Sequence, residues 1–192
     1  MERQPNLITS ISLFIVLITA TAFSNASDGF FYVTPQFTIT HLSFDRELVP
    51  EGLDRTSNAI GAQVSAGYQT PFWVVAEVGY GYAENIEALG STFDNHEIGE
   101  YRYALGVAIP LGNNVRLVPK AGRIRYRVTA EEGQFLNPGS EQGTTIENNE
   151  HYLQLDLEIR LSDLVGLDLS YVTANTHFGD IDAARIGVQF EF

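Results

Sequence analysis

The feature that most constrains the fold is an alternation of apolar and polar side chains in successive segments of about ten residues. In the last segment the apolar face consists of Ile186, Val188, Phe190 and Phe192. The opposite face carries charges of both signs, Arg185 and Glu191. A period of two predicts a β-strand. A mixed-charge face behind a purely apolar one is typical of a wall between lipid and a wet interior.

Eight segments of this kind predict an all-β fold, an eight-stranded antiparallel transmembrane up-and-down β-barrel. The predicted strands are Phe30–Leu42, Asn58–Gln69, Phe72–Ala83, Ile98–Leu111, Val115–Thr129, His151–Leu161, Gly166–Asn175 and Asp182–Phe192. The sixth alternates most regularly, with leucine or isoleucine at every second position from Leu153 to Leu161. About five such residues on a tilted strand cover the ~25 Å apolar band of a membrane barrel.

Short turns and long connections alternate along the predicted barrel. Turn-forming residues mark the short connections, at 69–71, 112–114 and 162–163. The remaining connections are 43–57, 84–97, 130–150 and 176–181. Outer-membrane barrels have short turns on the periplasmic side and longer loops outside the cell. We therefore expect both termini to be periplasmic and the long loops to be extracellular.

The long connections are acidic, and their charges together with that of Asp182 at the edge of the last one add up to the chain's net charge of −13. Strands and turns are therefore balanced. One interpretation of the acidic loops is a solvated surface that resists aggregation. The alternatives are the binding of divalent cations that bridge lipopolysaccharide phosphates, or an interaction with a basic partner. A chain of this charge is not expected to bind nucleic acid.

The polar faces of the predicted strands carry as many acids as arginines. The acids are Glu77, Glu100, Asp156, Glu158, Asp168 and Glu191, and the arginines are Arg102, Arg123, Arg125, Arg127, Arg160 and Arg185. We expect them to form ion pairs inside the barrel. Because an eight-stranded barrel has room for little besides its own side chains, a wide pore is not expected.

The fifth predicted strand is the least regular. Its apolar face contains Ile124 and Tyr126, but Lys120 is in phase with them. Pro119 cannot donate a hydrogen bond to a neighbouring strand, so we expect a β-bulge there that shifts the register. Pro35 in the first strand raises the same expectation.

Residues 1–26 are predicted to be a secretory signal peptide, and residues 27–192 the barrel domain. The apolar run Leu7–Ala20 follows Arg3 and precedes Ser24 and Ala26, a small-x-small cleavage pattern. An uncleaved anchor is the alternative, although ~14 apolar residues are short for a membrane helix. The absence of cysteine excludes disulfides, cysteine-ligated metals and a lipoprotein anchor. No metal and no cofactor is expected.

With these features, and with the ending Gly187–Phe192, the chain resembles the small eight-stranded outer-membrane barrels of the OmpA-transmembrane and OmpX/Ail kind. The resemblance covers the whole predicted barrel. It implies a monomer in the bacterial outer membrane, in contact with outer-membrane lipid and lipopolysaccharide. It also implies that the barrel-assembly machinery recognises the terminal Phe192 during insertion.

Histidine and serine are the residues to consider for chemistry. All four histidines, His41, His96, His151 and His177, lie near predicted extracellular strand ends. We interpret them as amphipathic rings at a membrane interface, the alternative being a metal or phosphate site. His41 and Ser43 share an outward face, which is similar to outer-membrane lipid A deacylases, where a histidine activates a serine. In that family an asparagine follows the serine, whereas here Phe44 does, and the nearest carboxylate is Asp45.

The leading hypothesis is a non-enzymatic outer-membrane barrel with a structural or surface-interaction role and no catalytic residues. One alternative is a lipid A-modifying enzyme that acts through His41 and Ser43. Another is a narrow pore of low conductance. A soluble lipocalin-like barrel is not expected, because the charged residues here share one face with the glycines and the apolar band cannot all fit inside. The extracellular partner is left open.

Overall fold

Antiparallel β-strands make up the regular structure of the protein in a computed structural model, which describes residues 29–44, 56–85, 96–130, 144–176 and 179–192. The strands are β1 (Phe30–Phe44), β2 (Thr56–Gln69), β3 (Val74–Asn85), β4 (His96–Val107), β5 (Ile109–Pro110), β6 (Val115–Ala130), β7 (Thr144–Arg160), β8 (Val165–Thr176) and β9 (Gly179–Glu191). Among the described residues, no helix is long and apolar enough to cross a membrane.

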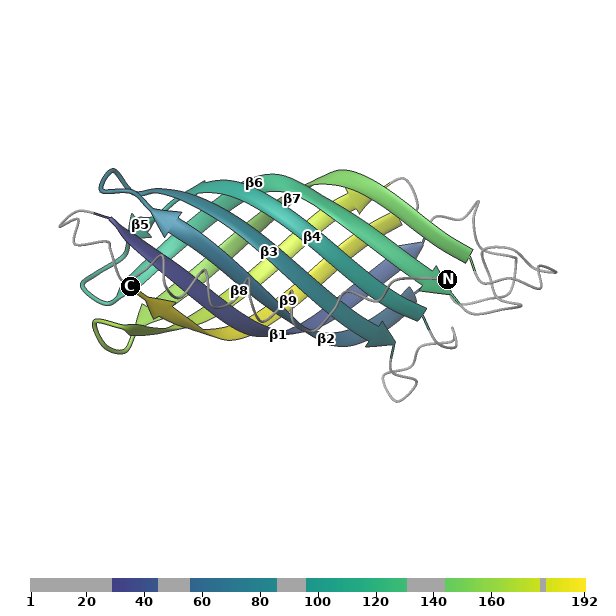
Figure 1. Cartoon of the computed structure of the whole chain (residues 1–192), viewed down its shortest axis with the longest axis horizontal. Helices are drawn as coiled ribbons and strands as arrows, with labels where there is room; N and C mark the ends of the chain where they lie inside the picture. The colour runs from purple at the N-terminus through teal and green to yellow at the C-terminus, as the bar shows by residue number, and fades with distance from the viewer. Residues whose placement is uncertain (1–28, 45–55, 86–95, 131–143, 177–178) are drawn as a thin grey trace, which may run out of the picture.

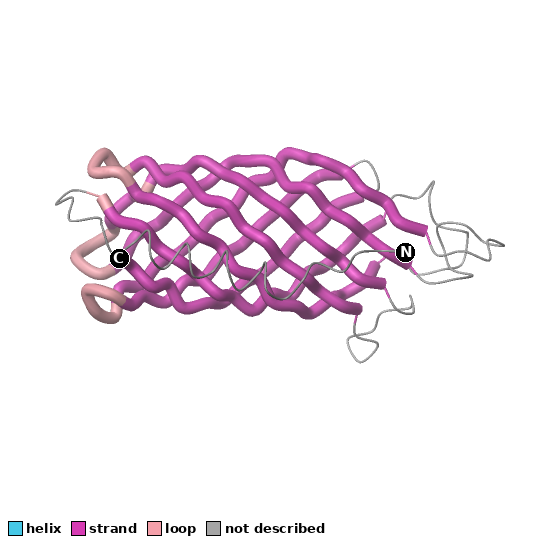
Figure 2. Tube along the Cα trace, in the orientation of Figure 1, coloured by secondary structure: helices cyan, strands magenta, loops and turns pink. Residues whose placement is uncertain are grey.

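The strands close into a barrel (Figures 1 and 2). Strands β1 to β4 and β5 to β9 each pair with their sequence neighbours, β1 also pairs with β9, and a β4–β6 pairing completes the ring. The short β5 continues β4, because the Gly106–Lys120 and Ile109–Leu117 pairs belong to one register on β6. The wall therefore has eight strands, and the predicted all-β, eight-stranded antiparallel barrel is confirmed.

The two prolines interrupt ladders without shifting them. Pairing of β4 and β5 with β6 is missing at Pro119 and resumes in the same register, while the β6–β7 ladder runs through Pro119 unbroken. Pro35 interrupts the β1–β9 ladder in the same way and leaves β1–β2 continuous. The expected bulges are therefore absent. A missing N–H removes one hydrogen bond, and the ladder on the other side of the strand keeps the register.

The barrel has a turn end and a loop end. At the turn end, residues 70–73, 111–114 and 161–164 connect strands, and Phe192 pairs with Phe31 through two backbone hydrogen bonds. The backbone of Trp73 has a φ of 66°, a left-handed conformation that few bulky residues adopt. At the loop end, strands are joined through 45–55, 86–95, 131–143 and 177–178, which lie outside the described residues, as does the predicted signal peptide.

At the loop end the strands extend further than the alternation predicts. β7 begins at Thr144, within the predicted 130–150 connection, so Glu147 and Glu150 belong to a strand. Asp180 likewise lies on β9, which begins at Gly179, before the predicted start at Asp182. A strand alternates between apolar and polar side chains only where one of its two faces contacts an apolar environment. The polar ends of these strands therefore carry no alternation by which sequence reasoning could find them.

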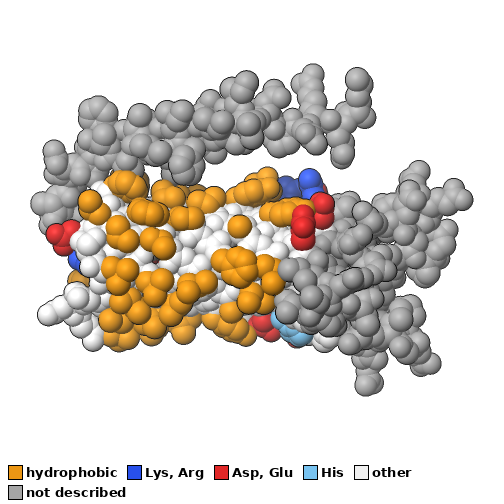
Figure 3. Space-filling model, turned by 90° about the horizontal axis from the view of Figure 1, so that it is seen from below, with side chains coloured by type: hydrophobic (Ala, Val, Ile, Leu, Met, Phe, Trp, Pro, Cys, Tyr) orange, Lys and Arg blue, Asp and Glu red, His pale blue; other side chains and the backbone are white. Residues whose placement is uncertain are grey.

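The polarity of the barrel is inside-out. Large apolar side chains are exposed on β1, β3, β4, β7, β8 and β9, for example Val78, Tyr101, Leu105, Leu153 and Ile186. On the face in Figure 3, hydrophobic side chains cover the middle of the wall and charged ones are visible only toward its ends. Inside, charged side chains are almost fully buried, with Lys120 4% and Asp156 1% exposed. A soluble barrel has the opposite arrangement.

Strand β6 faces the opposite way from our prediction. Ile124 and Tyr126 are buried in the interior, whereas Arg125 and Arg127 project outward with side chains 60% and 65% exposed. Lys120 is in phase with the buried residues and is itself buried. The strand thus keeps one phase throughout, so no bulge is needed to bring Lys120 inside.

Candidate functional site

The interior of the barrel contains a network of charged side chains, and Lys120 joins three strands there. Its ammonium on β6 lies 2.5 Å from a carboxylate oxygen of Glu77 on β3 and 2.5 Å from one of Asp156 on β7. Tyr32 on β1 donates a hydrogen bond of 2.9 Å to Glu77 Oε2, the same oxygen that Lys120 contacts. All four side chains are buried. A buried ammonium is tolerated because two carboxylates surround it.

A second group of ion pairs centres on Glu100. Its Oε1 lies 3.0 Å from an Arg102 guanidinium nitrogen and 2.9 Å from one of Arg185. Arg102 also reaches Glu77, at 3.5 Å, which links this group to Lys120. Gln63 accepts a further hydrogen bond from Arg102. Charged side chains of β3, β4, β6, β7 and β9 are therefore connected across the interior.

A third group lies toward the turn end. Glu191, beside the C-terminus, accepts hydrogen bonds from Arg116 at 2.6 Å and from Arg160 at 2.9 Å. Arg116 also lies 2.7 Å from Glu158 and 5.1 Å from the centre of the Phe30 ring. The terminal strand is thus held to β6 and β7 by side chains as well as by its own ladders.

Three buried carboxylates come close enough to hold a cation. Oxygen atoms of Asp156, Glu158 and Asp168 lie within 4.8 Å of one another. Each already has a protein partner: Lys120 at Asp156, Arg116 at Glu158, and the Ser170 hydroxyl at Asp168, 2.6 Å away. Two of the three carboxylates are thereby paired with cations, so the cluster belongs to the ion-pair network.

An apolar cluster fills the interior toward the loop end. Its largest members are Leu42, Ile98, Ile124, Tyr126, Tyr152, Val172 and Ile181. These side chains come from six strands and are at most 3% exposed. Sequence reasoning missed this cluster, because it assigned Ile124 and Tyr126 to the outer wall. The interior is therefore ionic around Lys120 and apolar near the loops.

The predicted set of interior charges is partly right. All six predicted acids point inward, as do Arg102 and Arg185, and Arg160 reaches in at the turn end. Arg123, Arg125 and Arg127 lie on the outward face of β6 instead, and Lys120 and Arg116 were missed. Alternation gave no signal for the missed pair, because Arg116 and Lys120 share the phase of the apolar Val118, which the expected polarity places on the outward face.

On the outside of the barrel, His41 lies between Ser43 and Asn58. Its Nε2 is 3.4 Å from the Ser43 hydroxyl, and its Nδ1 is 2.8 Å from the side-chain oxygen of Asn58, its partner across the β1–β2 ladder. Asp45, the carboxylate considered for orienting the imidazole, lies outside the described residues. An amide therefore occupies the orienting position.

Comparison with known proteins agrees with this architecture. The family model of the outer membrane protein beta-barrel domain matches residues 10–192. The chain belongs to this family. No curated protein matches the sequence.

Solved barrels from several bacteria have a similar fold. Neisserial surface protein A shares 15% identity and a TM-score of 0.65, over 84% of this chain and 97% of the other. The attachment invasion locus protein Ail of Yersinia pestis shares 12% identity and a TM-score of 0.61, over 86% and 99%. For OprG of Pseudomonas aeruginosa the values are 8%, 0.51, 85% and 96%. At these identities the likeness concerns the fold.

As an outer-membrane β-barrel, the protein resides in the bacterial outer membrane, and its exposed apolar side chains face hydrocarbon. This explains the inside-out polarity, because lipid tails solvate leucine and tyrosine rings that water would not. It also explains the tilt and full closure of the strands in Figure 1, since no unpaired sheet edge is stable in hydrocarbon.

We expect Lys120→Met to destabilise the barrel strongly, because Glu77 and Asp156 would lose the cation between them. Removing one partner of a buried ion pair costs about 3–5 kcal/mol. Arg125→Met, which removes an exposed pairing with Glu147, should cost at most about 1 kcal/mol. Urea unfolding in lipid vesicles, followed by the fluorescence of Trp73, the chain's only tryptophan, measures both. Equal losses would show that Lys120 is not a central contact.

Proposed function

We propose that this protein is a non-enzymatic, monomeric outer-membrane barrel with a structural and surface-interaction role, whose interior is closed by its own side chains. The observation that carries this proposal is the filled interior. Charged side chains around Lys120 pair with one another, and an apolar cluster around Tyr126 fills the interior between them and the loop end. A permeating ion would have to break ion pairs in the first region and lose its water in the second.

The proposed orientation places the turn end in the periplasm and the loop end outside the cell. Its support is the alternation of short turns with long connections, which is usual for barrels of this class. The acidic loops would then face the medium, where they interact with cations or a basic partner. Phe192 would enter the membrane from the periplasmic side, where the barrel-assembly machinery acts. Outer-membrane lipid and lipopolysaccharide are the partners proposed for the wall.

Planar-bilayer recordings test the closed interior. The wild-type protein should give no steady conductance steps. The double variant Arg102→Ala, Arg185→Ala removes two long side chains from the interior and should produce steps several-fold above the wild-type background. Large, stable steps from the wild-type protein would contradict a closed interior and favour the pore alternative.

Labelling of single cysteines in intact cells tests the orientation, since the chain has no native cysteine. Asp180→Cys at the loop end should react with a membrane-impermeant maleimide, because Asp180 is exposed there. Asn113→Cys, in an exposed turn at the other end, should react only after the outer membrane is permeabilised. The reverse pattern would show that the loops are periplasmic.

A second candidate function, lipid A deacylation, is favoured by one observation, the placement of His41 between Ser43 and Asn58. In such a reaction the imidazole takes the hydroxyl proton while the serine oxygen attacks an acyl ester. Mass spectrometry of lipid A from cells with the wild-type gene, a Ser43→Ala gene or no gene distinguishes the candidates. The non-enzymatic proposal expects three identical acylation patterns. Loss of a deacylated species in both the variant and the deletion would establish the enzyme.

A further inference from the structure

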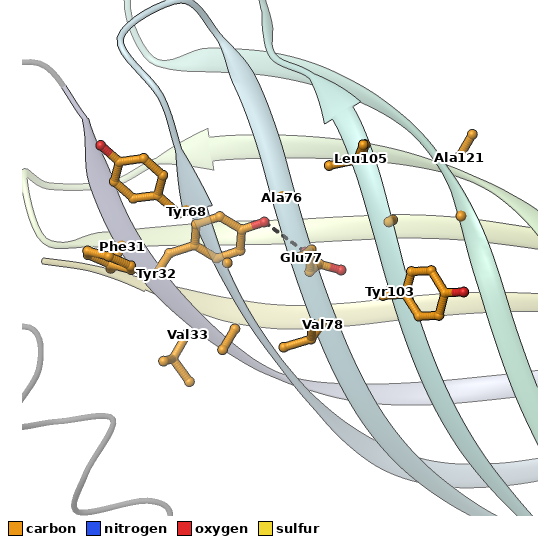
Figure 4. A pocket seen from close by; sticks show the side chains of 14 residues that line it. Phe31, Tyr32, Val33, Tyr68, Ala76, Glu77, Val78, Tyr103, Leu105 and Ala121 are labelled. Carbon is orange, nitrogen blue, oxygen red and sulfur yellow. Dashed lines mark hydrogen bonds between the residues drawn. The ribbon is translucent and has the colours of Figure 1, made fainter.

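Two neighbouring hollows lie on the outer surface of the barrel, the first over strands β1 to β4 and β6 and the second over β3, β4 and β6. The first is an apolar groove of about 770 Å³ whose floor includes the small side chains of Ala66, Ala76 and Ala121. Phe31 and Tyr68, with ring centres 4.7 Å apart, stand on one side of it, and Tyr103 and Leu105 on the other (Figure 4).

The groove arises from the order of side chains across the ladder. One outward row runs from Phe31 through Tyr68, Ala76 and Leu105 to Ala121. The small side chain of Ala76 therefore lies between two large ones, Tyr68 on β2 and Leu105 on β4. The polar side chains inside the wall here bond to one another, as Figure 4 shows for the hydrogen bond between Tyr32 and Glu77. The groove is a feature of the lipid-facing wall, and its mostly apolar lining suits a hydrocarbon chain.

The second hollow, a polar cleft of about 510 Å³, begins one ladder row closer to the loop end. Tyr80 and Tyr101 pair across β3 and β4 directly beyond the Val78–Tyr103 pair that borders the groove. Their rings lie 4.8 Å apart. The cleft continues over Gly99, which adds no side chain between Tyr82 and Arg127 in the next row. Arg125 completes this side of the cleft.

The cleft combines two guanidinium groups, three tyrosines and the carboxylate of Glu97. Arg125 and Arg127 both bond to one acceptor, Glu147, with the Arg125 contact at 2.5 Å. Each guanidinium has five N–H donors, so both keep donors for another acceptor. Arginine binds phosphate in a planar, bidentate manner, aromatic rings present flat apolar faces, and a carboxylate accepts hydrogen bonds from hydroxyl groups.

We infer that the two hollows form one binding site for a phosphorylated, acylated sugar lipid of the outer leaflet. An acyl chain lies in the groove over Ala76, the sugar lies against the tyrosines with a hydroxyl directed at Glu97, and a phosphate bonds to Arg125 and Arg127. The order of the parts matches such a lipid, because hydrocarbon comes first and phosphate nearest the loop end. This inference rests on the proposed function for its orientation, in which the loop end faces the outer leaflet.

The site also explains why arginines project from the wall of a membrane protein. An unpaired arginine facing hydrocarbon costs about 2–4 kcal/mol at the midplane and about 0–1 near the interface. Arg125 and Arg127 lie in the outer part of β6, beyond the apolar rows, where anionic head groups are the natural partners. Glu147 then holds the two guanidinium groups side by side and leaves some of their N–H donors available.

The test is native mass spectrometry of the folded protein titrated with bis-phosphorylated lipid A, with lipid A lacking both phosphates, and with phosphatidylglycerol. The wild-type protein should bind bis-phosphorylated lipid A most tightly. The double variant Arg125→Gln, Arg127→Gln should weaken this binding by about tenfold or more, since hydrogen bonds between charged groups are lost. Arg160→Gln, which removes a charge at the turn end, is the control and should leave binding unchanged.

A second pair of variants tests the groove. Ala76→Trp fills the floor of the groove with a side chain that lipid accepts, so the barrel should fold and bind lipid A several-fold more weakly. Ala184→Trp places the same side chain at an exposed wall position of β9, outside both hollows, and should bind as the wild type does. Heat-modifiability on gels verifies that each variant is folded.

The outcomes separate this inference from the proposed function. Wild-type binding by the double arginine variant, or by Ala76→Trp, would overturn the site. Equal binding of phosphatidylglycerol with the same dependence on both arginines would replace the sugar lipid by a general anionic phospholipid. Because the titration uses purified protein, its result does not depend on the orientation in cells, which cysteine labelling measures separately.

Discussion

Hydrocarbon cannot hydrogen-bond to a peptide group, and this makes closure of the sheet between β4 and β6 the constraint on which the structure depends. Without that pairing two full strand edges would face lipid, at a cost of several kcal/mol for each unpaired group. Pro119 and Pro35 interrupt the backbone hydrogen bonding of the ring only locally. Each breaks one ladder locally, and the ladder on its other side continues through Leu155 or Val64.

Closure creates an interior, and the interior selects the phase of each strand. Lys120 is the clearest case, because Glu77 and Asp156 reach it from strands that lie on opposite sides of β6 in the ring. Turning β6 over would bury Arg125 and Arg127 and expose Lys120 to lipid, leaving two carboxylates inside without their cation. A buried charge without a partner is far more costly than the exposure of Ile124. The ion pairs therefore determine the facing of the strand, and Tyr126 follows into the interior.

The same alternation has different consequences at different heights of the wall. In the middle, outward positions must be apolar, as Leu105 and Leu153 are. Toward the loop end, outward positions include Arg127 and His41, and inward positions become apolar, as at Ile98. This change of polarity places an arginine pair beside a tyrosine pair and beyond an apolar groove, and so produces a surface that an amphipathic lipid can match from end to end.

The sequence by itself determined the number of wall strands, the turns and the membership of each face, because side chains two residues apart on a strand must share a side. That was sufficient to place Leu153 beside Leu155, and His41 beside Ser43, on common faces. It was also sufficient to expect Glu77, Asp156 and Arg102 on the charged faces.

Only the tertiary structure decided which face of β6 points inward, how far β7 extends and which residues meet across the barrel. Alternation is identical for a strand and for the same strand turned over, so Arg125 and Ile124 could not be assigned without the neighbouring strands. Asn58 reaches His41 from 17 residues away, and Lys120 reaches Glu77 from 43. Such contacts follow from ladder register and ring closure, which are properties of the assembled sheet and of no single segment.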